Sequence, residues 1–225
     1  MFSKLLDRLE GRVGRHKGIR NLMTIIVIGT VIVFLADFIL PAAADGMKLS
    51  PWLSFSKSAI LQGQIWRLVT FVFVPESSYN LILFAISLYF YWLMGESLQN
   101  HWGTFRFTLF YTVGMLGAVI SCCITGYATS YYLNMSLMLA MACIYPDMQL
   151  NLHGLLNIRL KWLALLSVVM MALPMFSANG WQEPVALAAA LINVLIFFAD
   201  RLLKMIKQKW RHYQWKRNWR DAWKR

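Results

Sequence analysis

The stretch LMTIIVIGTVIVFLADFIL, from Leu22 to Leu40, decides the class of this protein. It is an apolar run with a single charged residue, Asp37. A helix needs roughly 20 predominantly apolar residues to cross the hydrocarbon core of a bilayer. Leu22–Leu40 comes close to that length, and the small residues that follow it are a weak cleavage signal. We therefore interpret the stretch as a membrane anchor and not as a signal peptide.

The remainder of the chain repeats this pattern. Hydrophobic residues make up 59% of the 225 residues and charged residues only 14%, a balance that excludes a soluble domain. Five more apolar runs follow, at Asn80–Met94, Phe107–Ile124, Tyr131–Tyr145, Trp162–Phe176 and Pro184–Ala199. We predict an all-α, polytopic bundle of six transmembrane helices. Five spans with one re-entrant segment are the alternative, because some runs are short for a span.

The net charge of +12 is distributed unevenly along the chain. With both termini in the cytoplasm, nineteen Lys and Arg residues lie on the inner side of the membrane and three on the outer side. Because cytoplasmic segments are enriched in Lys and Arg, this asymmetry predicts cytoplasmic N and C termini. The chain then divides into a basic N-terminal segment (1–21), a membrane domain (22–200) and a basic tail (201–225).

The tail alternates cations with tryptophans. Trp215, Trp219 and Trp223 recur every four residues, so a helix would carry them as one stripe, and Trp210 precedes them. This composition favours a basic amphipathic helix on membrane lipids. A cytoplasmic protein partner of the tail is the alternative. Nucleic acid is not expected, because a basic, Trp-rich tail beside a membrane favours lipid.

Cysteine usage indicates neither a disulfide framework nor a metal site. Cys122, Cys123 and Cys143 are odd in number and lie in apolar runs without paired Cys or His ligands. We expect no metal and no cofactor.

The segment GQIWRLVTFVFVP, Gly63 to Pro75, lies in a long and unusually apolar first loop. Such a loop is expected to lie partly in the outer membrane interface, with Trp66 and Arg67 at the headgroup boundary. This segment resembles the first loop of the rhomboid superfamily, in which a Trp-Arg pair occurs in intramembrane proteases and in derlins. The resemblance is to derlins and to rhomboid pseudoproteases of bacterial type, and it implies a rhomboid-like fold.

Three further segments are similar to the same superfamily. Gly95 and Glu96, followed by Gly103, resemble the residues that close the second rhomboid span. Asp147–Trp162 resembles the derlin connection between spans four and five, and Asn193–Asp200 resembles the end of derlin span six.

Rhomboid proteases pair a serine nucleophile on span four with a histidine base on span six. By this resemblance Ser136 stands at the nucleophile position, but both flanking glycines are absent and Asn193 stands in place of the histidine. A serine hydroxyl is a weak nucleophile without a base, and an amide does not take up a proton at neutral pH. Asn80 stands at an oxyanion position, where it would still donate a hydrogen bond. We therefore expect no catalytic residues.

Asparagines within hydrocarbon are costly and should face the bundle interior. Asn80, Asn134, Ser136 and Asn193 are therefore the candidates for binding a polar client helix.

The leading hypothesis is a catalytically inactive, derlin-like protein that binds transmembrane segments of client proteins and thins the bilayer, as in membrane-protein quality control. A rhomboid-type intramembrane serine protease with an atypical site around Ser136 is the alternative. A small transporter or channel is a further one. The short chain and small loops favour a bacterial inner membrane, with the endoplasmic reticulum as the alternative.

Overall fold

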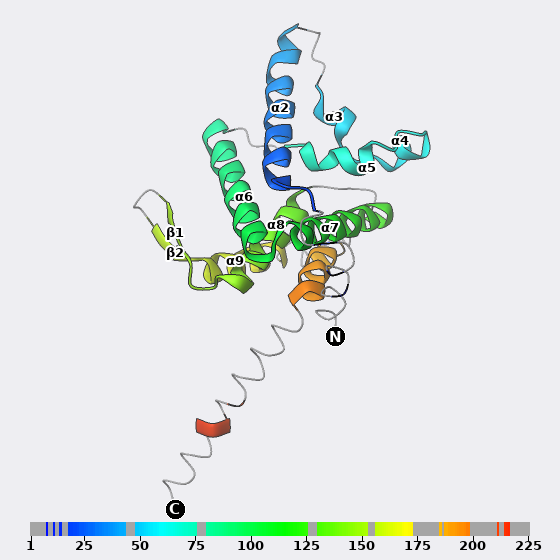
Figure 1. Ribbon diagram of the computed structural model, residues 1–225. Helices are drawn as coiled ribbons and strands as arrows, with labels where there is room; N and C mark the ends of the chain where they lie inside the picture. Colours follow the sequence, from blue (N-terminus) through cyan, green and yellow to red (C-terminus); the bar gives the residue numbers. More distant parts are fainter. Residues whose placement is uncertain are drawn as a thin grey trace, which may run out of the picture.

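The computed structural model describes residues 18–43, 48–75, 80–125, 130–152, 156–172 and 187–198, with isolated positions at 8, 11, 14, 185, 211 and 214–216. In chain order the main elements are α2 (Leu22–Ala43), α3 (Ser50–Leu53), α4 (Lys57–Leu61), α5 (Arg67–Thr70), the 3-10 turn η1 (Phe71–Phe73), α6 (Leu81–Trp102), α7 (Thr104–Thr125), α8 (Tyr131–Ile144), β1 (Gln149–Leu152), β2 (Leu156–Arg159), α9 (Leu160–Ala172) and a helix at Leu187–Phe198 (Figure 1).

Three of these helices are long and apolar enough to cross a membrane, at Leu22–Leu40, Leu81–Trp102 and Thr104–Thr125. Three shorter apolar helices follow in the described residues, at Tyr131–Ile144, Leu160–Val169 and Leu187–Phe198. The helical membrane class is therefore confirmed, and three spans are supported by length and composition. That all six apolar helices cross the bilayer stays a prediction.

Helices α2 and α6 pack side by side (Figure 1). Gly95 of α6 permits this approach, because a Cβ at that position would lie 2.3 Å from Cγ of Met23. The Trp92 indole donates a hydrogen bond to the Thr24 hydroxyl at 3.2 Å. Phe34 and Phe84 stack further along the pair, with ring centroids 4.1 Å apart.

A sharp turn at Gly103 joins α6 to α7. Its φ of 84° is in the region that favours glycine, and its N–H donates to the Gln99 carbonyl at 2.8 Å. The chain therefore changes direction within one residue, which places the end of α6 beside the start of α7.

The start of α2 and the end of the helix Leu187–Phe198 lie at one end of the bundle. The N–H of Ile19, just before α2, donates to the Thr108 hydroxyl near the start of α7. Trp102, at the end of α6, contacts the rings of Phe197 and Phe198 at the end of the final helix. This arrangement agrees with an even number of spans. The membrane side on which that end lies stays a prediction.

The first loop folds into short helical turns at the other end. Asp37 of α2 accepts hydrogen bonds from the N–H groups of Leu49 and Ser50, and the Ser50 hydroxyl donates to the same carboxylate. The Lys57 ammonium donates to the Cys123 carbonyl at 3.0 Å, which links the loop to the end of α7. The loop thus extends from α2 to α7.

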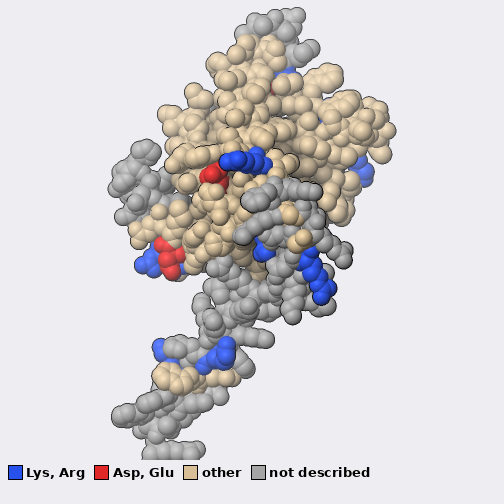
Figure 2. Space-filling model, viewed as in Figure 1, with Lys and Arg blue, Asp and Glu red and all other residues tan. Residues whose placement is uncertain are grey.

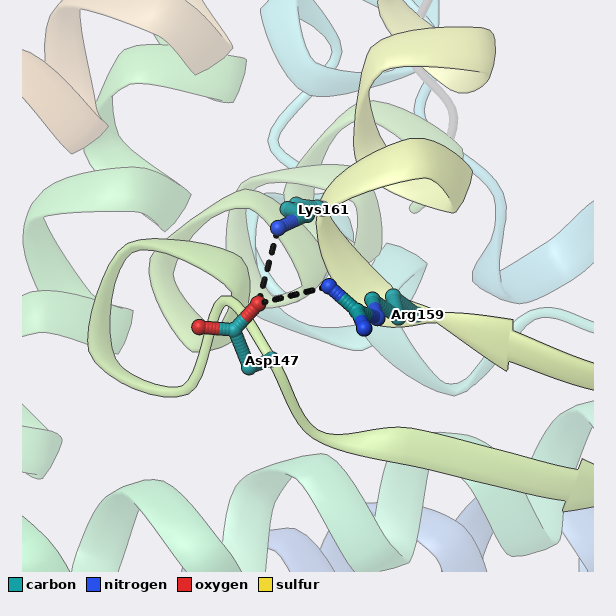
Figure 3. A network of polar contacts seen from close by, with 3 residues as sticks. All are labelled: Asp147, Arg159 and Lys161. Atoms are coloured by element: carbon teal, nitrogen blue, oxygen red, sulfur yellow. Dashed lines mark hydrogen bonds and ion pairs between the residues drawn. The ribbon is translucent and has the colours of Figure 1, made fainter.

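A short β-hairpin was not foreseen by the sequence analysis. Strands β1 and β2 are antiparallel, pairing Gln149 with Arg159 and Leu152 with Leu156, and β2 runs directly into α9. At its base the Lys161 ammonium lies 2.7 Å from the Asp147 carboxylate and the Arg159 guanidinium 3.6 Å from it (Figure 3).

Large apolar side chains cover the outside of the helices. Figure 2 shows one face, which consists mostly of uncharged residues with the described charges in small, separate groups. The exposed set includes Ile25, Ile28, Ile32 and Phe38 of α2, Leu116, Ile120 and Ile124 of α7, and Leu165 and Leu166 of α9. A surface of this kind is suited to lipid. Most of segments 1–21 and 201–225 lies outside the described residues.

Candidate functional site

Ser136 lies on α8, in the interior of the bundle. It is 1% exposed, and its hydroxyl donates a 2.7 Å hydrogen bond to the Leu133 carbonyl one turn earlier on the same helix. Serine inside a helix commonly bonds back to the preceding turn in this way. The hydroxyl proton is thus engaged by a backbone carbonyl and not by a base.

Asn193, on the helix Leu187–Phe198, reaches Ser136 from across the bundle. It is 3% exposed, and its Nδ2 donates to Oγ of Ser136 at 3.3 Å. Its Oδ1 is buried without a hydrogen-bond partner among the described residues. A buried acceptor without a donor costs free energy, so this oxygen is suited to receive a donor from water or from a bound group.

Gly114 of α7 makes room for the asparagine. A Cβ at that position would lie 2.6 Å from Nδ2 of Asn193 and 2.7 Å from Cδ1 of Leu133. Three helices therefore meet at one point: α7 supplies the space, α8 the hydroxyl and the final helix the amide. Gly114 is not among the site residues that the sequence predicted.

The described surroundings of Ser136 offer no proton acceptor of the required kind. Its partners there are a carbonyl and an amide, neither of which takes up a proton at neutral pH. His101 pairs instead with Tyr145, at 3.2 Å. Tyr145 follows α8 about 13 Å along the helix axis from Ser136, at 1.5 Å per residue. His16, His153 and His212 lie outside the described residues.

The asparagines do not all gather at this point. Asn134 is buried on α8, as expected for an intramembrane amide. Asn80 is not: it is exposed just before α6, and its Oδ1 accepts from the N–H groups of Ile82 and Leu83 at 2.9 and 3.4 Å. The prediction that Asn80 faces the bundle interior is therefore wrong. Asparagine is a favoured N-cap, and capping explains its place.

The Trp-Arg pair divides between surface and interior. Trp66 is exposed, whereas Arg67 is buried and donates to the carbonyls of Pro51 and Ser54, each at 2.7 Å, and to Oε1 of Gln64. Arg67 thus braces the first loop from within.

The remaining motif residues have structural surroundings. Gly95 and Gly103 allow the close approach and the turn described above. Glu96 accepts a hydrogen bond from Asn100 on the same helix at 3.3 Å. Trp215 is exposed, and Trp210, Trp219 and Trp223 lie outside the described residues. Within the described part of the chain, no three His, Cys, Asp or Glu residues are grouped to hold a metal ion.

Two further buried hydroxyls were missed by sequence reasoning. Tyr111 OH and Ser121 Oγ are buried without a hydrogen-bond partner among the described residues. They share a face of α7 with Gly114, at spacings of three and seven residues. This spacing is a signal of burial only once the buried face of α7 is known, because the helix carries further polar residues at Arg106, Thr108 and Thr112.

The chain matches one known protein family over most of its length. The matching family is described as "Eukaryotic integral membrane protein (DUF1751)", and the match covers residues 20–199. The chain belongs to this family. DUF1751 membership establishes an integral membrane protein, consistent with the three helices of spanning length. No curated protein matches the chain.

The family description also bears on the source membrane. Because DUF1751 is described as eukaryotic, it gives no support to a bacterial type or to a bacterial inner membrane. The match begins just before α2 and ends just after the final helix. It therefore includes Ser136 and Asn193 and excludes the basic tail.

Proposed function

We propose that this DUF1751 protein is a catalytically inactive, rhomboid-like membrane protein that binds transmembrane segments of client proteins. The observation that carries the proposal is the Ser136–Asn193 hydrogen bond. The partner of the buried serine is an amide, and the amide oxygen has no described donor of its own. A polar group on a client helix would supply that donor.

The packing of α6 supports a route to this site. Its inner part is buried at Met94, Gly95 and Leu98, whereas Leu81 and Leu83 at its start are exposed. Phe84 and Leu88 are buried as well, and Phe84 stacks on Phe34 of α2, so it is only in the first turn of α6, residues 81–83, that every side chain is exposed. A client helix would enter between the start of α6 and its neighbours, next to the first loop.

The length of α8 supports a thinned bilayer. Both of its ends are described, and its 14 residues span about 21 Å at 1.5 Å per residue. The hydrocarbon core of a typical bilayer is about 30 Å thick. Lipid that thins to match α8 would lower the cost of a poorly hydrophobic client helix. Such clients suit membrane-protein quality control, in an internal membrane such as the endoplasmic reticulum.

The binding experiment uses vesicles that contain the purified full chain and a synthetic transmembrane peptide of leucine and alanine. One peptide carries a central asparagine and its twin a leucine, and energy transfer between labels reports association. Intramembrane hydrogen bonds contribute about 0.6–1.7 kcal/mol, so the asparagine peptide should bind about threefold to twentyfold more tightly. Asn193→Leu should abolish the difference.

Thr112→Val is the matched control, because it removes one hydroxyl from the exposed face of α7. It should leave the preference unchanged. Equal binding of both peptides to the wild-type protein would rule out the polar site as a client receptor.

Inactivity is tested separately with a fluorophosphonate probe, which labels activated serines. The wild-type chain should label no more than Ser136→Ala. Labelling that disappears in the variant would reveal an activated serine and favour the protease alternative.

A further inference from the structure

Arg67, at the start of α5, is a buried cation whose acceptors are all neutral. Its side chain is only 7% exposed. The guanidinium donates to the backbone carbonyls of Pro51 and Ser54 and to the amide oxygen of Gln64. Each of these oxygens carries a partial charge, and none carries a full negative charge. The bonds therefore satisfy the N–H groups of Arg67 without neutralising its charge.

The first loop supplies no counter-charge for this cation. Residues 48–75 contain three cations and neither aspartate nor glutamate. The carboxylate that does contact the loop, Asp37 of α2, accepts from the N–H groups of residues 49 and 50. Among the described residues Arg67 forms no ion pair. Because burying a charge is costly unless an opposite charge accompanies it, an anion from outside the chain would stabilise the loop.

The guanidinium retains donors for such an anion. Of its five N–H groups, the three bonds above use the one on Nε and both on Nη1, which leaves Nη2 without a described acceptor. The fully buried, unpartnered polar side-chain atoms of the described residues lie on α7 and the final helix, so Nη2 reaches the loop surface. Nε2 of Gln64 is held close by, because Oε1 of the same amide is 2.7 Å from Nε of Arg67.

The surface around this guanidinium is apolar and aromatic. Helix α3 contacts both α2 and α5, so the short helices of the loop lie beside the bundle (Figure 1). Three side chains adjacent in sequence to Arg67 or to its acceptors are about half exposed: Trp52, Trp66 and Val69. Tryptophan concentrates where acyl chains meet headgroups, and arginine is well suited to bind phosphate. A phospholipid offers an anionic phosphate and apolar chains in one molecule.

We propose that Arg67 and Gln64 form a phospholipid site on the first loop. Nη2 of the guanidinium and Nε2 of the amide donate to the phosphate of one membrane lipid, whose acyl chains lie along Trp52, Trp66 and Val69. The phosphate supplies the negative charge that the loop lacks. This site is separate from the client site at Asn193 and does not depend on it.

The test measures Tm of the delipidated full chain in maltoside detergent with added phosphatidylglycerol. Diacylglycerol with the same acyl chains tests the apolar part of the lipid alone, and inorganic phosphate tests the free anion. A specific ligand at about 100 times its dissociation constant should raise Tm by roughly 5–10 °C for a chain of this size. Phosphatidylglycerol should produce a shift of this kind, whereas diacylglycerol and inorganic phosphate should each produce less than a third of it.

The deciding variant is Gln64→Glu, which places a carboxylate beside Nε of Arg67 and so supplies the counter-charge within the chain. Its Tm without lipid should equal or exceed that of the wild type, and phosphatidylglycerol should shift it by less than half as much. Gln62→Glu is the matched control, because it adds the same charge at an exposed position of the same loop. It should respond to the lipid as the wild type does. The basic tail is identical in all three proteins, so its lipid binding cancels in the comparison.

Four results would overturn the proposal. Equal lipid shifts in Gln64→Glu and the wild type would show that the lipid acts elsewhere. A lower Tm of Gln64→Glu without lipid would show that Arg67 does not lack a counter-charge. A diacylglycerol shift as large as that of phosphatidylglycerol would make the phosphate irrelevant. An equally large shift with inorganic phosphate would indicate a site for a free anion and not for a lipid.

Discussion

The first loop and the base of the β-hairpin lie at opposite ends of the bundle. Polar contacts of the same length hold both, but those of the loop are buried and those of the hairpin base are exposed. In the first loop, the Arg67 guanidinium donates to the carbonyls of Pro51 and Ser54, each at 2.7 Å, and the arginine is only 7% exposed. At the hairpin base, the Lys161 ammonium lies 2.7 Å from Asp147, whose side chain is 71% exposed. Distance alone therefore does not rank these contacts.

Burial decides the ranking because water competes with every exposed contact. An exposed ion pair contributes about 0–1 kcal/mol, since solvent screens both charges. Removing the donor from a buried pair leaves acceptors without a partner, which costs about 1–3 kcal/mol for each group. The first loop should therefore be a rigid unit that depends on Arg67, and the hairpin should depend little on Asp147.

Arg67→Met should have the largest effect. It retains much of the apolar stem but leaves the carbonyls of Pro51 and Ser54 without their donor. We expect the free energy of unfolding to fall by about 3 kcal/mol. Unfolding in mixed micelles with sodium dodecyl sulfate measures this change. Arg67→Lys should recover only part of it, because a single ammonium lacks the fork of the guanidinium.

The matched control is Lys57→Met, which removes an exposed cation from the same loop and one bond to the Cys123 carbonyl. Its effect should stay below about 1 kcal/mol. Equal losses for the two variants would contradict the view that burial separates them.

Asp37→Ala should rank second. The Asp37 carboxylate accepts from two N–H groups and one hydroxyl at the start of α3, in partly buried surroundings. Without it, the loop should detach from α2 at a cost of about 2 kcal/mol. Limited proteolysis checks the location, since new cleavage should appear between residues 44 and 56. Unchanged cleavage there would show that Asp37 does not hold the loop.

The long helices could be predicted from the sequence, but the structure of the connections between helices could not. The apolar run at Leu22–Leu40 and those of α6 and α7 predicted helices of spanning length, because hydropathy and length suffice for that inference. The hairpin at 149–159 was missed because four-residue strands give too short a pattern. The buried position of Arg67 was also missed, since a cation in an apolar loop ordinarily extends toward headgroups.

The part of the candidate site that lies within two helices could be predicted from the sequence. Ser136 and Asn193, which resemblance placed together, do form a hydrogen bond. Asn80 was expected beside them, yet it caps α6 at the surface. An asparagine that directly precedes an apolar run can either cap the helix or face the bundle interior. The sequence does not distinguish these two positions, whereas the backbone structure does. The buried hydroxyls of Tyr111 and Ser121 required the helix faces to be known.

Thr70→Val should have a smaller effect within the first loop. The Thr70 hydroxyl donates to the Leu53 carbonyl at 3.0 Å in partly buried surroundings. Valine keeps the shape and removes this single neutral bond, so we expect a loss of about 1 kcal/mol. The same micelle titration measures it. A loss as large as that of Arg67→Met would mean that charge adds nothing to the bracing of the loop.

Asp147→Asn should have the smallest effect. The hydrogen bond and charge of Lys161, with Arg159 contributing less, hold the pKa of the exposed Asp147 carboxyl below its ordinary value. A lowered pKa in the folded state stabilises the protein above the unfolded pKa, and this contribution is lost as pH falls through the folded pKa. Wild type and variant should therefore differ slightly in Tm at pH 7 and converge as the pH falls through the folded pKa of the carboxyl. Added salt should narrow the gap at pH 7, because exposed charges are screened.

The backbone bonds of Leu160 and Lys161 close the hairpin base without the carboxylate, which is why its loss should be tolerated. A Tm shift as large as that of Arg67→Met would mean that the hairpin base is far less exposed in the membrane than its side chains indicate.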